Sequence, residues 1–446
     1  MIFAPNKNRS LAVLLIGLLG GASAPVSAMS LTEAYQLATR HDPAVASALA
    51  QYQADVEAGT LERATLRPVV SATGKYEYAT TDSKGVFGNA DDPYKAWSAG
   101  LSARQPLFRL DWFARGDRAD ALDDLADISV TQRRQELLLR VADRYFAVLN
   151  AQDAVEQSTA EAKAVRESLE DTRKRYEVEL VPGTDLKEAQ ARDDLAQARL
   201  LSANRSLENA RDALDEVTGN GREPLPQIVE GTSFPPLEPA RAEDWVKAAQ
   251  EHSPVIAQAR QKLVIAGADR RSRTSDAAPS LDLVGSIGRN DDSDFTFGQR
   301  VDDSRVGVEL SVPLYAGGAV SAAKRQSAAM ERFADAELKR TTLETERQTR
   351  QLFNQVQTAY AETDAYNKAL GSAQAAEKAT RAGYEAGTRT ITDVLDAQSR
   401  TVQARQNYDS TRYSLLLNLL QLKQTVGRLS ERDFAEIDKL LQSSPQ

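Results

Sequence analysis

The sequence predicts a mainly α-helical protein with a transmembrane β part, in which a unit of one β-hairpin and one long antiparallel helical hairpin occurs twice. The first observation is an internal repeat: Tyr384–Ala404 is an imperfect copy of Tyr176–Ala196, so the copies lie 208 positions apart (384 − 176). The second is a pair of segments with alternating apolar and polar residues in each half. The third is a long stretch of strong helix formers on each side of each copy. Together they indicate a tandem duplication in which the copied stretch is the turn of a helical hairpin.

Composition and charge argue against several classes of protein. The chain has 446 residues, of which 41% are hydrophobic and 27% charged, and its formal net charge is −9. This acidic balance gives no support to nucleic-acid binding, which favours a basic surface. The absence of cysteine excludes a disulfide scaffold and a lipoprotein acylated on cysteine.

Residues 1–28 are predicted to be a secretory signal peptide. Lys7 and Arg9 precede an apolar run from Leu11 to Leu19, and small residues follow up to Ala28. The alternative is an N-terminal membrane anchor. About nine apolar residues are too few for this role, because a bilayer core needs about 20.

The first repeat, residues 29–219, is expected to begin with helical sequence from Leu31 to about Leu66. A break at Asp42 is predicted because this residue can cap a helix in which Pro43 takes the first position. The second repeat, residues 243–428, has the same break at Ser253-Pro254. The two histidines of the chain, His41 and His252, precede these breaks. Equivalent positions beside equivalent caps favour a structural role over a metal-binding or catalytic one.

Four segments that follow Pro68 and Pro279 alternate with the period of two that is typical of strands. Their expected apolar face contains Val70, Ala72, Gly74, Tyr76, Tyr78, Trp97, Ala99, Leu101, Ala103, Leu281, Leu283, Gly285, Ile287, Val306, Val308, Leu310 and Val312. The polar connections, residues 80–94 and 289–304, are expected to be loops.

Each alternating segment has about the nine to eleven residues of a membrane-spanning strand. Soluble hairpins alternate in the same way, so they are the alternative. If the strands lie in a membrane, four of them cannot close a barrel, and open edges in lipid would leave costly unpaired backbone groups. The membrane interpretation therefore predicts a homotrimer, whose barrel would contain about twelve strands.

Long helices are predicted on both sides of each copied stretch. Between Asp111 and about Tyr176 there is no proline, and Leu137, Val141, Tyr145 and Val148 form a narrow apolar stripe. The return helix is expected from Thr184 to Thr218. A rod of about 65 residues is on the order of 100 Å long, and it can bury so narrow a stripe only against other rods.

Two further segments lack this pattern. Residues 220–242 contain five prolines and are expected to form a connector between the repeats. Residues 429–446 are expected to form a short amphipathic helix and a polar tail.

Several motifs are similar to those of a known family. They are the strand endings QPLF at Gln105 and VPLYAGG at Val312, and above all YEAGTRTITDVLDAQ from Tyr384. With the duplicated unit around them, they resemble the TolC-like family of outer-membrane efflux and type I secretion channels across essentially the whole mature chain.

The resemblance implies a homotrimer in the outer membrane of a Gram-negative bacterium, where contact with lipid is made by a short β-barrel. A long α-helical barrel would continue this β-barrel into the periplasm. The helical tips would close the inner end until a periplasmic adaptor, or membrane fusion protein, and an inner-membrane ABC or RND transporter dock there. The duct would be passive and would need no cofactor. Its cargo, protein or drug, is left open.

The resemblance also implies roles for residues of the tips. Asp393 and Asp396 match the acidic pair of the constriction, and Tyr384 and Arg389 match latch residues that pair with positions Thr184 and Asp185. Because Asp393 and Asp396 are three residues apart, they would share one helix face. The candidates for adaptor docking are Leu180, Val181, Pro182, Gly183 and Gly387. The first tip departs from the pattern, because Glu179 stands where the second copy has Gly387, and Pro182-Gly183 replaces a more apolar pair.

Two other functions are alternatives. An adaptor-like periplasmic binding module with a coiled-coil hairpin would carry one such hairpin, whereas this chain carries two. An enzyme of the envelope would need a nucleophile, metal ligands or paired acids in a plausible pocket, and the sequence offers no such constellation.

Overall fold

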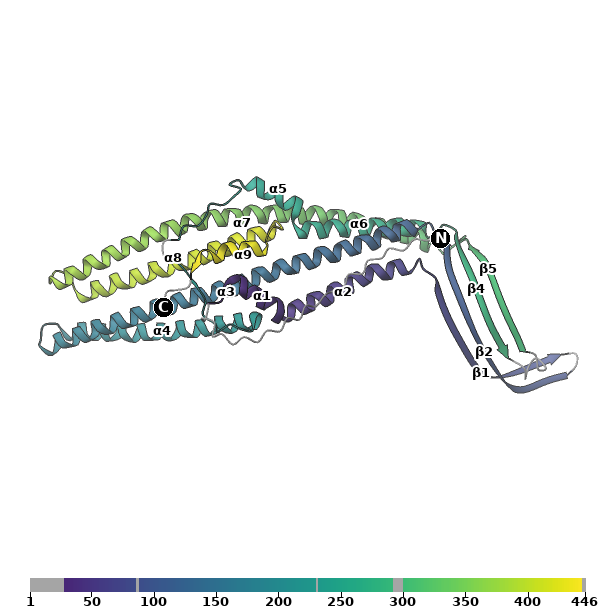
Figure 1. The fold of residues 1–446 in the computed structure, drawn as a ribbon, viewed down its shortest axis with the longest axis horizontal. Coiled ribbons are helices and arrows are strands. Elements are labelled where there is room, and N and C mark those ends of the chain that lie inside the picture. Colours follow the sequence, from purple (N-terminus) through teal and green to yellow (C-terminus); the bar gives the residue numbers. More distant parts are fainter. Residues whose placement is uncertain (1–27, 86–87, 230–231, 292–299, 443–446) are drawn as a thin grey trace, which may run out of the picture.

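The computed structural model describes residues 28–85, 88–229, 232–291 and 300–442 (Figure 1). All but the last residue of the predicted signal peptide lies outside this range. The described part forms a long bundle of helices, and a β-sheet extends from one end of it at an angle.

Two long helical hairpins dominate the bundle, as predicted. The first consists of α3 (Trp112–Glu177) and α4 (Gly183–Thr218), and the second of α7 (Ala319–Glu385) and α8 (Ile391–Thr425). With 66 residues, α3 is about 100 Å long. The predicted stripe is confirmed, since Leu137, Val141, Tyr145 and Val148 are all buried. No described helix combines the length and the apolar composition needed to cross a bilayer.

Two pairs of shorter helices lie along these rods. They are α1 (Leu31–His41) with α2 (Pro43–Ala64), and α5 (Ala242–His252) with α6 (Pro254–Ser275). The predicted break is confirmed, because the Asp42 side chain caps α2 by accepting a hydrogen bond from the Ala44 N–H. Contacts join α2 to α3, α3 to α6 and α6 to α7, so the helices beside the sheet form a single layer in this order.

Equivalent glycines end the two return helices. Gly219 and Gly427 both have a φ of 72°, a left-handed conformation that closes a helix and suits glycine. Gly219 packs against the ring of His41, and a Cβ on Gly427 would come within 2.2 Å of the His252 carbonyl oxygen. The two histidines therefore have equivalent packing positions, which supports the structural role expected for them.

The sheet contains four antiparallel strands in the order β1 (Val69–Gly85), β2 (Gly88–Phe108), β4 (Ser280–Asp291) and β5 (Arg300–Ser311). The prediction of a loop at residues 80–94 is wrong for most of this range, because β1 and β2 stay paired up to Gly85 and Gly88. Backbone pairing needs no apolar side chains, so a polar sequence can extend a ladder whose register is already fixed. The second hairpin is also longer than expected, and residues 292–299 of its loop lie outside the described range.

Register confirms the predicted faces of the sheet. One row across the four strands contains Val70, Ala103, Gly285 and Val306, and the next contains Ser71, Ser102, Ser286 and Arg305. Apolar side chains of the first face are exposed in the single chain, with Val306 84% exposed. On the polar face Arg104 forms ion pairs with Asp282 at 2.8 Å and Glu309 at 3.1 Å.

The ends of the sheet order are β1 and β5, so these are its two edges. The four strands alternate in direction, so the edge strands β1 and β5 run in opposite directions. Strand β5 of one copy can therefore pair antiparallel with β1 of another. The sheet is thus suited to closure by further copies of itself.

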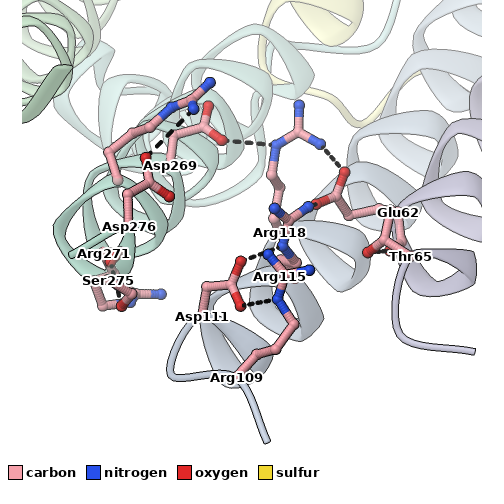
Figure 2. Close-up of polar contacts among 11 residues, drawn as sticks. Glu62, Thr65, Arg109, Asp111, Arg115, Arg118, Asp269, Arg271, Ser275 and Asp276 are labelled. Atoms are coloured by element: carbon pink, nitrogen blue, oxygen red, sulfur yellow. Dashed lines mark hydrogen bonds and ion pairs between the residues drawn. The ribbon is translucent and has the colours of Figure 1, made fainter. Parts of the chain in front are cut away.

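Ion pairs fix the helices where they meet the sheet, near the start of α3 (Figure 2). Arg115 bridges Asp111 at 2.6 Å and Glu62 of α2 at 3.2 Å. One turn later Arg118 contacts Glu62 and Asp269 of α6. Three helices are therefore tied together at the joint.

The connector and the C-terminal region meet beside the bundle. Strand β3 (Gln227–Ile228) of the connector pairs with β6 (Leu441–Gln442), which follows α9 (Glu431–Asp438). Phe434 of α9 is fully buried, with its ring 5.9 Å from that of Tyr35. These contacts join the C-terminal region to the first repeat.

The two hairpin turns have the same backbone design but different residues at one position. The Leu180 N–H donates to the Arg175 carbonyl, and the Thr388 N–H donates to the Gly383 carbonyl, the six-residue closure of a Schellman motif. At the left-handed position the second turn has Gly387, with φ 75°, whereas the first has Glu179, with φ 60°. Among described non-glycine residues, Glu179 alone has a positive φ.

We predict that Glu179→Gly stabilises the protein by about 1 kcal/mol, because a side chain in the left-handed region costs roughly this much. The measurement is the thermal unfolding midpoint of the purified protein in detergent. Glu179→Ala is the control, since it removes the carboxylate but keeps Cβ. Equal midpoints for the glycine and alanine variants would show that the turn is not strained.

Candidate functional site

The candidate site lies at the hairpin tips, at the end of the bundle farthest from the sheet (Figure 1). Both turns lie at this end. Of the residues suggested for adaptor docking, Leu180, Pro182, Gly183 and Gly387 are exposed and Val181 is half-buried. The exposed fraction of Leu180 is 73%, so most of this apolar side chain faces solvent.

A small apolar cluster joins the two hairpins near the tips. Its members come from α3, α4 and α8, and Tyr384 of α7 packs against it. They are Ala162, Val165, Ala196, Ile391, Val394 and Leu395. The cluster is much smaller than the main core around α1, α3 and α9. Apolar burial therefore holds the tips together more weakly than the middle of the bundle.

Tyr384 reaches from α7 to the first hairpin. Its hydroxyl lies 3.4 Å from a carboxylate oxygen of Asp171, and the guanidinium of Arg175 lies 4.9 Å from the centre of its ring. Arg175 and Asp171 also form an ion pair at 2.9 Å. Burial raises the pKa of Tyr384, so the hydroxyl stays protonated and can donate.

The other predicted latch residues lie close to these groups. Thr184 and Asp185 occupy the first turn of α4, where the Thr184 hydroxyl donates to Asp185 at 3.3 Å. Asp185 is near enough for its charge to raise the pKa of Tyr384 further. Arg389 lies in the second turn, where its backbone N–H donates to Gly383 and its side chain packs against that glycine. The Tyr384 hydroxyl donates its hydrogen bond to Asp171 rather than to Thr184 or Asp185.

The two predicted gate aspartates have different partners. Asp393 forms a capping box at the start of α8, where it accepts hydrogen bonds from the backbone N–H and hydroxyl of Thr390. These hydrogen bonds lower the pKa of Asp393, so this carboxylate is charged at neutral pH. Asp396 forms an ion pair with Arg192 of α4 at 2.7 Å. Asp393 therefore has a partner at the start of its own helix, and Asp396 has one on the other hairpin.

A buried polar cluster joins α3 to α8 between the tips and the main core. Asp153 accepts a hydrogen bond of 2.8 Å from the Tyr413 hydroxyl and lies 3.9 Å from Arg412. Arg412 pairs with Asp409, which also accepts from Gln157. Burial raises the pKa of Asp153 to about 6, and the nearby Asp409 adds to the rise while Tyr413 and Arg412 oppose it. The cluster fixes how the second hairpin sits on the first.

Sequence reasoning missed these cross-hairpin partners. Asp171 and Arg175 lie on an exposed, highly charged stretch of α3, where nothing in the sequence separates them from their neighbours. A usable signal was present for the buried cluster, because Asp409 and Arg412 occur within the apolar positions of α8. Charged residues on an apolar stripe indicate a buried pair.

Comparisons with known proteins decide the family. The family model described as "Outer membrane efflux protein" matches the chain over residues 34–220 and again over residues 245–428. The chain belongs to the outer membrane efflux protein family.

Several relatives of this family cover nearly the whole chain. The outer membrane protein TolC of Vibrio cholerae is 34% identical over 94% of this chain and 95% of its own. The alkaline protease secretion protein AprF of Pseudomonas aeruginosa is 31% identical over 91% of this chain and 86% of its own. Among solved structures, the CmeC outer membrane channel of Campylobacter jejuni superimposes with a TM-score of 0.77 over 99% of both chains, at 16% identity.

These findings confirm the TolC-like fold and argue against the adaptor-like alternative, because the family match covers both repeats. Outer membrane efflux proteins of this kind lie in the outer membrane of Gram-negative bacteria and extend into the periplasm. The protein is accordingly an outer-membrane exit duct for secretion or efflux.

The raised pKa of Asp153 predicts a pH-dependent effect of its replacement. A carboxyl whose pKa is higher in the folded than in the unfolded protein contributes stability below its unfolded pKa, and this contribution is lost as pH rises through about 6. Asp153→Asn removes the buried charge, so its stability relative to the wild type should improve by on the order of 1–2 kcal/mol between pH 4.5 and pH 7.5.

The measurement is the unfolding midpoint of both proteins at the two pH values. The exposed Asp143, also on α3, supplies the control variant Asp143→Asn, for which no such change is expected. If the difference between Asp153→Asn and the wild type were the same at both pH values, Asp153 would titrate normally.

Proposed function

We propose that three copies of this chain form one continuous passive duct, with a closed β-barrel in the outer membrane and a helical barrel in the periplasm. The tips form its inner gate, and a periplasmic adaptor with an inner-membrane transporter opens it. The proposal needs no catalytic group and no cofactor, because the work of transport is done by the partner.

The observation that carries the proposal is the open sheet with an exposed apolar face. Closure of β1 on β5 of a neighbouring copy satisfies the backbone groups of both edges, and three copies give twelve strands. The apolar row through Val70 and Val306 then faces lipid, and the polar face around Arg104 lines the lumen. The outer-membrane lipid is therefore a direct partner.

The gate proposal is supported by the contrast between the tips and the rest of the bundle. At the tips, a small apolar cluster, the Tyr384 contact and the partly exposed Arg192–Asp396 pair join the two hairpins. Exposed hydrogen bonds and ion pairs each contribute about 1 kcal/mol or less. A docked partner can therefore separate the tips without disturbing the main core.

Partners are proposed from the relatives and from the exposed turns. AprF and PrtF are named as protease secretion proteins, and CzcC as a cobalt-zinc-cadmium resistance protein. The proposed partners are a membrane fusion protein and either an ABC transporter for protein cargo or an RND transporter for small molecules. Leu180, Val181, Pro182, Gly183 and Gly387 are the proposed contact points for the adaptor.

We predict that the double variant Tyr384→Phe, Arg389→Ser raises single-channel conductance in planar bilayers, by about twofold or more. The phenylalanine loses the hydroxyl contact to Asp171, and the serine cannot form the proposed ion pair at the tips. Tyr176→Phe changes the equivalent tyrosine of the first turn and serves as the control. Unchanged conductance in the double variant would contradict the latch.

We also predict that Asp393→Asn with Asp396→Asn lowers the preference for cations over anions by about twofold and weakens block by multivalent cations. Asparagine is chosen because it keeps a capping oxygen at position 393. The measurement is the reversal potential in a salt gradient. If cation preference and block both persisted, the acidic constriction would lie elsewhere.

A further inference from the structure

Arg192 forms an ion pair that joins the two helical hairpins at the tips. It lies on α4 of the first hairpin, and its side chain is 27% exposed. One guanidinium nitrogen, Nη2, is 2.7 Å from Asp396 of α8, and Nε is 3.1 Å from Glu188 on its own helix. It therefore lies between a carboxylate of each hairpin.

The positive charge of Arg192 partly neutralises the two carboxylates beside it. Glu188, Arg192 and Asp396 together carry one net negative charge, and they would carry two without the arginine. A trimer would repeat this change three times around one narrow opening. In such a constriction, a charge at each subunit changes the local concentration of cations and anions in opposite directions.

We propose that Arg192 is a specificity-determining residue of the gate, which masks Asp396 while the two hairpins are in contact and exposes it when they separate. This inference rests on the proposed function, because it assumes that Asp396 borders the lumen. The closed tips then present a weaker negative charge than the open tips, so cation preference increases on opening.

The repeat supports a special role for Arg192. Its counterpart in the second hairpin is Arg400, at the same offset of 208. Arg400 is exposed, and within the described part of the chain no ion pair joins it to an acidic residue. Of these two equivalent arginines, only Arg192 thus has an acidic partner on the other hairpin among the described residues.

A structural ion pair and a charge mask predict different results for paired variants. If the pair acted only as a clasp, Arg192→Gln and Asp396→Asn would both loosen the tips and change selectivity in the same direction. If Arg192 masks Asp396, removal of the arginine increases cation preference and removal of the aspartate decreases it. The signs of the two effects therefore separate the explanations.

The experiment measures reversal potentials of the full-length channel in planar bilayers under a potassium chloride gradient. The expected result is that Arg192→Gln raises the permeability ratio of potassium to chloride by about twofold, that Arg192→Lys keeps it near the wild-type value, and that Arg400→Gln leaves it unchanged. Conductance of the same variants is recorded to detect opening of the tips.

The outcomes distinguish the inference from the function on which it rests. If Asp396→Asn lowers the ratio but Arg192→Gln does not raise it, Arg192 is only a structural residue and the inference is overturned. If Asp396→Asn leaves the ratio unchanged, the acidic gate itself is wrong, and the inference falls with it. An equal rise for Arg192→Gln and Arg400→Gln would also overturn the inference, because any lost positive charge would then have the same effect.

Discussion

Unpaired backbone groups at two strand edges are the constraint on which the rest of this structure depends. The four-stranded sheet has an apolar face that is exposed in the single chain, and its edges are β1 and β5. In lipid, each unpaired N–H or C=O costs several kcal/mol, so such a sheet is stable only when another strand covers each edge. Alternating strand directions allow copies of the same sheet to do this, and closure around an axis leaves no edge.

The helical part follows from the same requirement for partners. The long helix α3 has a narrow apolar stripe, which it buries in the main core against residues of α1, α4, α8 and α9. Large apolar contacts hold the middle of the bundle, whereas the tips depend on a small cluster and on polar contacts such as that of Tyr384 with Asp171. The proposed gate therefore lies where the contacts between the two hairpins are weakest.

Much of the fold could be predicted from the sequence, because the signals are local and duplicated. The period of two placed Val70 and Val306 on one face, and the return helix expected to end at Thr218 ends there in the structure. The length of β1 and β2 was missed, because a polar ladder has no periodic apolar signal. The tip contacts were also missed in part: the family pattern named Tyr384 and Asp396, but their partners Asp171 and Arg192 depend on how two separate hairpins pack.

The most direct test of the account is the mass of the purified protein in detergent, measured by native mass spectrometry after the detergent is removed. Closure of the sheet by sister copies predicts a single species with the mass of three mature chains. A species with the mass of one chain, under conditions that preserve membrane complexes, would contradict the account, because the sheet would then tolerate its open edges.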